Sequence, residues 1–243
     1  MNLSIVVPAY NEEKLLPRCL DSIQHAMTTM GREANGLKVE VIVTDNNSTD
    51  STGRIAQNRG ATVVFESVNQ ISRARNQGAA VASGDWLLFL DADSVLHPRT
   101  LRELTTRVHC GTCVGGGCVV ALDQAPLWAR TGVVVWNVIS RTMRWAAGSF
   151  FFCRRDAFED LSGFSELMYA SEEIDLSRRL KHWSAQRDLR FVILTAHPHV
   201  SSGRKLDLYS KREILLLCCR CLFRPGYTTR NKDQLGYFYD SRR

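Results

Sequence analysis

The side chains best suited to chemistry are Asp91 and Asp93, in an Asp-Ala-Asp that directly follows the apolar run Trp86–Leu90. Apolar residues without alternation predict a strand buried on both faces, as in a parallel sheet covered by helices. Open α/β sheets bind their ligands at the carboxyl ends of such strands. The two carboxylates would therefore offer hard oxygen ligands to a divalent cation at that edge, and the cation would in turn hold a diphosphate.

Alternating strands and helices must position these carboxylates. The hydrophobic pattern predicts a helix after the first strand, helices at 70–83, 98–108 and 207–223, and strands at 3–7, 39–43, 61–65, 86–90, within 146–153 and at 190–194. Pro8 is expected to stop the first strand. Gly115–Gly117 should break any simple strand, either as a bulge or to let the backbone approach a sugar. This alternation calls for a mostly parallel sheet with right-handed crossovers.

Length and charge set the class of protein. At 243 residues, one domain is expected. The start has no basic segment or cleavage site, and no apolar run is long enough to span a bilayer, so a cytoplasmic protein is expected. The net charge of +6 comes from dispersed basic residues without a nucleic-acid motif. Anionic small molecules or an anionic membrane surface explain it, and no nucleic-acid partner is expected.

The cysteines allow two interpretations. Cys110-x-x-Cys113 with nearby Cys118, and Cys218-Cys219-x-Cys221, suggest zinc, but no clean second pair follows. Because most have apolar neighbours and nothing indicates an oxidising compartment, buried reduced thiols are favoured over a metal site or disulfides.

The loop after the first strand is expected either to cradle a nucleotide or to be only the acidic start of a helix, which the helix dipole favours. The segment 8–13 lacks the Gly-x-Gly-x-x-Gly that would admit a pyrophosphate in a dehydrogenase. Asp45 follows the second strand directly, where its carboxylate could accept a hydrogen bond from a nucleobase N–H.

Four motifs occur in one order: Val-Val-Pro-Ala-Tyr-Asn-Glu-Glu (6–13), Asp-Asn-Asn-Ser-Thr-Asp (45–50), Arg-Ala-Arg-Asn-x-Gly (73–78) and Leu-Asp-Ala-Asp (90–93). Through them the chain resembles the family 2 glycosyltransferases over nearly its whole length. The resemblance implies the α/β GT-A fold, Rossmann-like, in one domain, 1–243. Residues 1–95 would bind the nucleotide sugar, and 96–243 would form the acceptor half and a C-terminal helix.

The resemblance also implies roles for individual residues and a divalent cation, Mn²⁺ or Mg²⁺. The residues expected to contact the nucleotide-sugar donor are Pro8, Ala9, Tyr10, Glu12, Asp45, Arg75 and Asp91. Asp91 and Asp93 would serve the ribose and the metal, and His199 is a candidate further ligand, although a lone histidine is often structural. Arg204 and Lys205 would stabilise the leaving phosphates.

The acidic stretch from Glu172 has two interpretations. Ser171 followed by acidic residues is typical of a well-capped helix. The family commonly carries Glu-Asp-x-Asp-Leu here, with the Asp after Glu acting as the base that deprotonates the acceptor hydroxyl. Aligned on Leu176, that position is Glu173, which is favoured over Glu172. A base opposite the departing diphosphate implies one displacement with inversion.

Other assignments remain open. A nucleotidyltransferase that makes sugar nucleotides, or a non-catalytic nucleotide- or carbohydrate-binding module, could share this fold. Trp128, Trp136 and Trp145 in the apolar segment 126–145 are expected in the core rather than facing the acceptor. The helix at 207–223 would serve core packing, a homodimer contact or peripheral attachment to an anionic membrane. The aromatic tail at 235–240 is expected to fold back onto the domain. Neither the donor's base and sugar nor the acceptor is specified.

Overall fold

The computed structural model describes residues 1–31, 36–123, 125–204, 206, 209, 212, 213, 216, 220 and 225–239. Among them, one central sheet has the strand order β3-β2-β1-β4-β6-β5-β7. Its strands are β1 Asn2–Ala9, β2 Lys38–Asp45, β3 Thr62–Phe65, β4 Trp86–Leu90, β5 Cys113–Leu122, β6 Phe150–Arg154 and β7 Arg190–Ser201. Neighbouring strands are parallel except that β6 runs antiparallel to β4 and β5. The predicted α/β fold with a mostly parallel sheet is confirmed.

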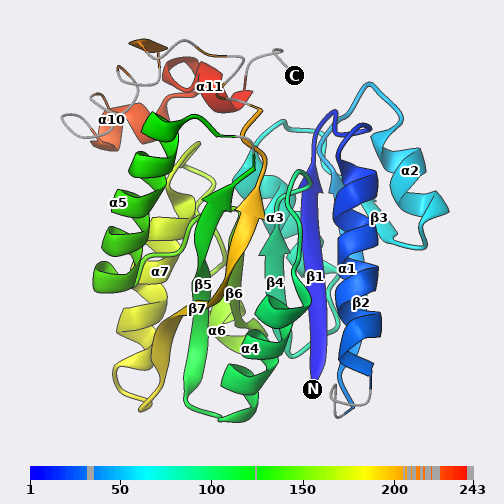
Figure 1. Cartoon of the computed structure of the whole chain (residues 1–243), viewed down its shortest axis with the longest axis vertical. Coiled ribbons are helices and arrows are strands. Elements are labelled where there is room, and N and C mark those ends of the chain that lie inside the picture. Colours follow the sequence, from blue (N-terminus) through cyan, green and yellow to red (C-terminus); the bar gives the residue numbers. More distant parts are fainter. Residues whose placement is uncertain are drawn as a thin grey trace.

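Helices cover both faces of the sheet (Figure 1). The described helices are α1 Leu16–Met30, α2 Thr52–Asn58, α3 Ile71–Ala80, α4 Pro98–His109, α5 Leu127–Met143, α6 Arg155–Asp160, α7 Glu172–Ser184, α10 Pro225–Arg230 and α11 Gly236–Tyr239, with a 3₁₀ turn at Lys232–Gln234. One core cluster packs α1 and α4 against the sheet, and a second packs α3, α6 and α7 against the opposite face.

Strand β4 is buried on both faces, as its sequence predicts. Leu88 and Leu90 belong to the cluster under α1 and α4, whereas Leu87 and Phe89 belong to the other. Phe89 packs edge-on against Phe164, with ring centroids 4.9 Å apart. The strand is therefore held from both sides, and its carboxyl end presents Asp91 and Asp93 at a fixed edge of the sheet.

The prediction that Gly115–Gly117 would break any simple strand is wrong, because all three glycines lie in β5 and pair with β6. Neighbouring chain leaves no room for side chains: a Cβ on Gly116 would lie 2.1 Å from the carbonyl oxygen of Val192, and one on Gly117 2.6 Å from Cβ of Ala146. An irregularity of the bulge type, also expected here, does occur. The pairing of β5 with β7 shifts register on either side of the glycines. The glycines serve close packing inside the sheet.

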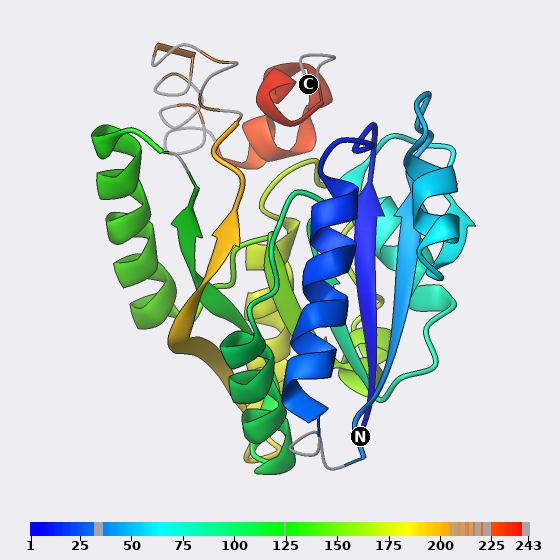
Figure 2. The same cartoon turned by 45° about the vertical axis from the view of Figure 1, so that its right-hand side comes forward.

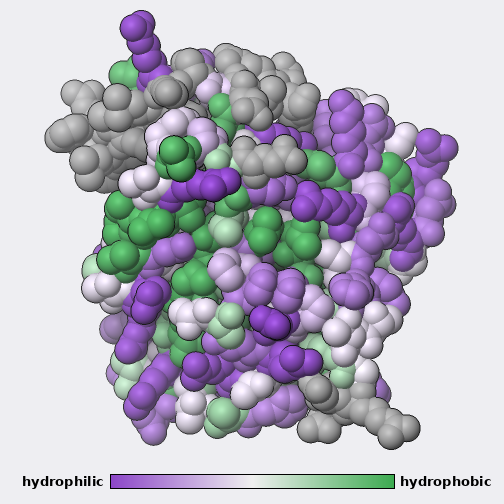
Figure 3. Space-filling model, viewed as in Figure 1, coloured by the Kyte–Doolittle hydropathy of each residue, from purple (hydrophilic) through white to green (hydrophobic). Residues whose placement is uncertain are grey.

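The expectation that the tryptophans of the apolar segment 126–145 lie in the core is wrong for Trp128, because much of helix α5 is exposed. Leu127 is 80% exposed, Val134 62% and Val138 58%, and even Trp128 is 38% exposed. The helix stands at one end of the molecule, beside β5 (Figure 2). Polar contacts hold the helix to β5. The side chain of Asn137 accepts a hydrogen bond from the amide of Val120 at 2.9 Å and donates one to the carbonyl of Val120 at 2.8 Å. Val120 lies beyond Gly117, where the pairing of β5 with β6 ends. Figure 3 shows the resulting hydrophobic surface over α5.

The helices α10 and α11 lie above the ends of β5 and β7, at the same edge of the sheet where β1 and β4 end (Figure 1). Leu235 is fully buried, which confirms that the tail folds back onto the domain. Most of the predicted helix at 207–223, with Cys218, Cys219 and Cys221, lies outside the described residues. Of the described cysteines all five are free and four are buried, in agreement with reduced thiols. Across the described residues, no helix is long and apolar enough to cross a membrane.

Candidate active site

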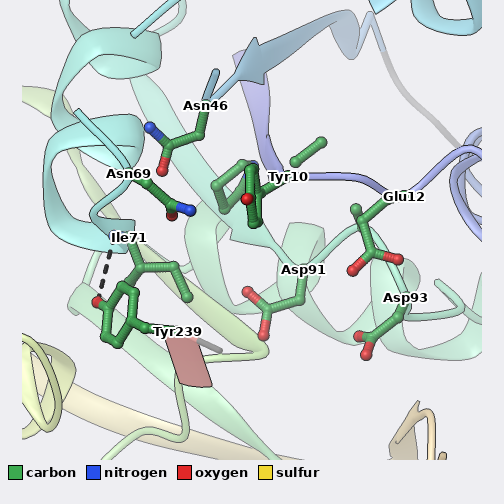
Figure 4. Close-up of a pocket in the computed structure, with 11 residues that line it drawn as sticks. Tyr10, Glu12, Asn46, Asn69, Ile71, Asp91, Asp93 and Tyr239 are labelled. Carbon is green, nitrogen blue, oxygen red and sulfur yellow. Dashed lines mark hydrogen bonds between the residues drawn. The ribbon is translucent and has the colours of Figure 1, made fainter. Parts of the chain in front are cut away.

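A pocket opens at the carboxyl ends of β1 and β4 (Figure 4). It is lined by Pro8, Ala9, Tyr10, Glu12, Asn46, Asn69, Ile71, Asp91, Ala92, Asp93 and Tyr239. The predicted residues of the first loop and of the Asp-x-Asp thus meet in one place, although they are far apart in sequence. The charged side chains Glu12 and Asp93 lie toward one end, and Ile71 and Tyr239 toward the other.

The loop after β1 is shaped by the loop after β2. Asn11 adopts the left-handed conformation, with φ 52°, and its Oδ1 accepts a hydrogen bond from the amide of Thr49 at 2.8 Å. The amide of Glu12 donates to Oγ1 of Thr52 at 2.8 Å. Because these bonds fix the backbone on both sides of the turn, the side chains of Tyr10 and Glu12 are held toward the pocket.

Asp45 is not among the residues that line the pocket. Its Oδ1 accepts a hydrogen bond from the amide of Ser48 at 2.9 Å, and a Cβ on Gly53 would lie 2.7 Å from its Oδ2. The carboxylate is therefore turned toward the start of α2, and its contact with a nucleobase stays a prediction. The next residue, Asn46, lines the pocket, and its Oδ1 accepts from the amide of Gln70 at 3.0 Å.

The buried guanidinium of Arg75 joins the pocket to the start of α7. Nη2 donates to Oδ1 of Asp91 at 3.1 Å and to the carbonyl of Gly148 at 2.9 Å, and Nη1 donates to Oε1 of Glu172 at 2.8 Å. One face of the group lies 5.3 Å from the ring centroid of Phe164. Arg75 thus contacts Asp91 directly, beside the pocket wall rather than within it.

Glu172 and Glu173 begin α7 in different environments. Glu172 is buried and paired with Arg75; burial raises its pKa, and the charge of Arg75 opposes that rise. Glu173 is only partly buried, and a Cβ on Gly148 would lie 3.2 Å from its Oε1. Burial of its carboxyl and the negative charge of Glu172 raise the pKa of Glu173 to about 8. Glu172 is fixed as an ion-pair partner, whereas the pKa of Glu173 lies close to neutral pH.

The positively charged guanidinium of Arg204 lies among the carboxylates at the charged end of the pocket. Arg204 forms an ion pair with Glu12 and approaches Asp93, with Nη2 3.9 Å from Oδ2. The predicted basic loop therefore does reach the site through Arg204. Lys205, predicted beside it, lies outside the described residues.

His199 is almost completely buried at the end of β7, 1% exposed, and neither ring nitrogen has a hydrogen-bond partner among the described residues. Burial lowers its pKa to about 4, opposed by the charge of Asp91, so the imidazole is neutral and can bind a metal. A buried, neutral imidazole without hydrogen-bond partners is suited to binding a divalent cation, and together with the carboxylates of Asp91 and Asp93 it would offer the mixed O and N donors that suit Mn²⁺. The described residues form no ready-made cluster of three such ligands.

Tyr239 is a pocket residue to which the sequence assigned no role. It comes from the aromatic tail and reaches a wall built by Asn69 and Ile71. Its aromatic character was the only signal, since no motif links residue 239 to residue 71. Ala92 and Asn46 were missed for a related reason: they sit beside the predicted aspartates, and only the backbone path decides which neighbour faces the pocket.

Residues 4–162, well over half of the chain, match the family described as Glycosyl transferase family 2. The chain belongs to glycosyltransferase family 2. Solved glycosyltransferases share the architecture of this family 2 chain. TarS of S. aureus, residues 1–349, aligns over 98% of this chain and 80% of its own, with a TM-score of 0.64 and 18% identity. Glucosyl-3-phosphoglycerate synthase of Mycobacterium tuberculosis aligns over 90% and 78%, with a TM-score of 0.59 and 21% identity. The expected GT-A fold is thereby confirmed.

Sequence relatives match this family 2 glycosyltransferase over parts of their length. The uncharacterized glycosyltransferase MG060 homolog of Mycoplasma pneumoniae is 22% identical over 75% of this chain and 66% of its own. The poly(ribitol-phosphate) beta-glucosyltransferase of Bacillus spizizenii is 33% identical over 42% of this chain and 16% of its own. The chain therefore spans from a sixth to two thirds of the length of these relatives.

Proposed function

We propose that this chain transfers a sugar from a uridine diphosphate sugar to an acceptor hydroxyl, in one displacement that inverts the sugar carbon. The observation that carries the proposal is the path Asp91–Arg75–Glu172, in which one buried guanidinium links the donor pocket to the carboxylates that begin α7. Donor pocket and candidate base are thus parts of one rigid arrangement, as a direct displacement requires.

Uridine as the donor base is supported by the structural relatives. TarS of S. aureus has been crystallised with UDP and with UDP-GlcNAc, and glucosyl-3-phosphoglycerate synthase with Mn²⁺ and UDP-Glc. In this chain, Pro8, Ala9 and Tyr10 would contact the nucleoside, and Arg75 would hold Asp91 in place beside it. Glu12 would contribute to donor binding indirectly, because its ion pair with Arg204 holds that guanidinium at the pocket.

A divalent cation, Mn²⁺ or Mg²⁺, would be held by Asp91, Asp93 and His199, and when bound it supplies positive charge to the diphosphate. Arg204 adds a second positive charge at the same end of the pocket, and its guanidinium can pair with phosphate oxygens in place of Glu12. Both charges favour departure of the diphosphate.

Glu173 would take the acceptor proton as the acceptor oxygen bonds to the sugar carbon and the bond to the diphosphate breaks. A base works best when its pKa lies close to the working pH, and the pKa of about 8 meets this condition. Glu172 is less suited because its Oε1 is committed to Arg75 at 2.8 Å. Glu172 instead keeps Arg75 aligned.

The test is calorimetric titration of wild type and Asp93→Ala with UDP, GDP, ADP, CDP and TDP, each with Mn²⁺ and with Mg²⁺. Selective binding of UDP that needs the cation and is lost in Asp93→Ala supports the proposal. Binding of none of the five would leave the non-catalytic module as the better account. Release of pyrophosphate from UTP and a sugar phosphate would identify a nucleotidyltransferase instead.

For the acceptor side we propose contact with an anionic membrane through α5. Leu127, Val134, Val135 and Val138 point away from the domain and are exposed, within an arc of about 100° around the helix axis. Monomeric proteins seldom leave such a surface uncovered. An amphipathic helix of this kind lies in the lipid interface, with its apolar side in the acyl boundary.

The charges on and beside α5 support an anionic surface as the proposed partner. Arg130 and Arg141 are exposed and lie within about 20° of one another on one flank of the helix, and the exposed Arg144 follows the last residue of the helix. The helix itself contains no acidic residue. Lys181 of α7 donates to the carbonyl of Met143 at 2.8 Å and adds a further positive charge to that flank. A lipid-linked acceptor held at this surface would then be the substrate that Glu173 deprotonates.

Vesicle sedimentation tests this contact. Wild type should bind phosphatidylglycerol vesicles and not phosphatidylcholine vesicles, and Val138→Glu and Arg141→Glu should each lose binding. Val81→Glu, at an exposed valine after α3, is the matched control and should bind. Absence of wild-type binding at low salt would remove the proposal. A dimer in light scattering that Val138→Glu dissociates would show that a second copy covers the face instead. A cytoplasmic location remains a prediction.

A further inference from the structure

The C-terminal segment reaches into the donor pocket through one residue, Tyr239. Its hydroxyl accepts a hydrogen bond from the amide of Ile71 at 3.4 Å, across 168 positions of sequence. Lys232 of the same segment donates to the carbonyl of Asn69 at 3.2 Å. The segment is thus fastened at two points to the stretch 69–71, which forms the uncharged wall of the pocket.

Charge divides the pocket into two ends. Asp93 and Glu12 lie at one end with Arg204, which suits a diphosphate and its cation. Ile71 and Tyr239 lie at the other, with Tyr10 between the two ends (Figure 4). A nucleobase is a flat, uncharged ring, and it is stabilised by an aromatic face rather than by carboxylates. The uncharged end is the one that fits it.

Tyr239 also touches the segment that leads to the candidate base. Its hydroxyl donates to the carbonyl of Tyr169 at 2.9 Å, and the two rings pack edge-on with centroids 5.7 Å apart. The amide of Tyr169 in turn donates to the carbonyl of Thr229 at 2.7 Å. The C-terminal segment therefore braces the turn that precedes Glu172 and Glu173. Burial raises the pKa of Tyr239 above its ordinary value, so the hydroxyl keeps its proton.

We propose that Tyr239 is a positioning residue of the donor site: its ring forms the wall against which the nucleobase packs, and its hydroxyl ties that wall to the turn before the base. The inference rests on the proposed donor site and adds the C-terminal segment to it. Recognition of the base and placement of Glu173 then depend on the same side chain.

The test compares Tyr239→Ala, Tyr239→Phe and wild type, with Tyr227→Ala as the matched control, since Tyr227 belongs to the same segment and is 61% exposed. Tyr239→Ala should weaken UDP binding about tenfold, the usual loss when an aromatic partner of a base is removed. Its binding of inorganic pyrophosphate with Mn²⁺ should equal that of wild type. Tyr227→Ala should match wild type in both measurements.

Tyr239→Phe separates the ring from the hydroxyl. It should bind UDP as wild type does, while its kcat falls about fivefold because the carbonyl of Tyr169 loses its donor. If Tyr239→Ala does not fold, Tyr239→Leu replaces it, since leucine fills the wall without an aromatic face. Unchanged UDP affinity in a folded Ala or Leu variant overturns the inference. Failure of wild type to bind any nucleotide would overturn the proposed function instead.

Discussion

Nη1 of Arg75 lies 2.8 Å from Oε1 of Glu172, and the two side chains are only 2% and 4% exposed. The desolvation of a buried ion pair largely cancels its attraction, so such a pair adds little net stability. Breaking it is costly because one charge stays buried alone. The value of this pair is orientation: it fixes the guanidinium that also holds Asp91 and the carbonyl of Gly148.

Arg75→Met should therefore lower the free energy of unfolding by about 3–5 kcal/mol and abolish donor binding. Denaturant unfolding followed by circular dichroism, with UDP titration of any folded fraction, measures both. Arg73→Met is the control, since Arg73 pairs with Glu166 at the surface at 2.7 Å, and the loss there should be about 0–1 kcal/mol. Equal stability of the two variants would contradict the role of the buried pair.

Glu173→Gln should lower kcat by a factor of about 10²–10⁴, because an amide cannot take the acceptor proton. UDP affinity should stay unchanged, as Glu173 does not line the donor pocket. The measurement is turnover of a UDP-sugar, by sugar transfer or by hydrolysis, beside UDP titration. Turnover equal to wild type would exclude Glu173 as the base.

The pH profile of kcat/KM should have an acidic limb near pH 8. The pKa of Glu173 is raised to about 8 by burial and by the charge of Glu172, so the ionised, active base forms only as the pH rises through that value. Glu172→Gln removes one negative neighbour and should move the limb to lower pH. A limb that stays in place in Glu172→Gln would show that another group controls the rate.

His199→Leu should weaken Mn²⁺ binding about tenfold or more. Because both ring nitrogens lack partners among the described residues, an apolar replacement should leave the free energy of unfolding within about 1 kcal/mol of wild type. Mn²⁺ titration by electron paramagnetic resonance, together with thermal unfolding, gives both quantities. Wild-type Mn²⁺ affinity in a stable variant would assign His199 to the structure alone.

Gly116→Ala should destabilise the fold by about 1–3 kcal/mol through overpacking, since its Cβ would meet the carbonyl of Val192 and the ring of Phe152. Gly132→Ala in α5 is the matched control, because nothing lies within 4 Å of a Cβ there. A helical glycine in open space should gain about 0.5–1 kcal/mol on becoming alanine. Thermal unfolding of the pair checks the opposite signs.

The elements that could be predicted from the sequence are those in which the pattern of apolar residues directly reflects which faces are buried in the fold. Strand β4 is apolar throughout because both its faces are covered. Its position could therefore be predicted, and with it the position of Asp91 and Asp93, which follow the strand in the sequence. Strand β1 runs on to Ala9, past the expected stop at Pro8, because a strand end tolerates proline. Helix α5 could not be predicted in the same way, since an apolar pattern does not say whether that side faces a core or the surface.

Contacts between distant segments lay beyond sequence reasoning. Arg75 and Glu172 are 97 positions apart, and no local rule pairs them. The direction of Asp45 depends on the space left by Gly53 in the following helix. The place of Tyr239 depends on the return of the chain from β7, at one edge of the sheet, to the ends of β1 and β4.

The antiparallel strand β6 has a consequence for how this fold could vary between related chains. Phe150, at its start, pairs with Leu90, at the end of β4, while β5 ends at Leu122 near the same edge. The stretch between them, including α5, therefore leaves and rejoins the sheet on the side of the active site. Such an excursion can be exchanged as one cassette between related chains. Grafting it would leave the first 95 residues, and with them every residue that lines the pocket except Tyr239, untouched.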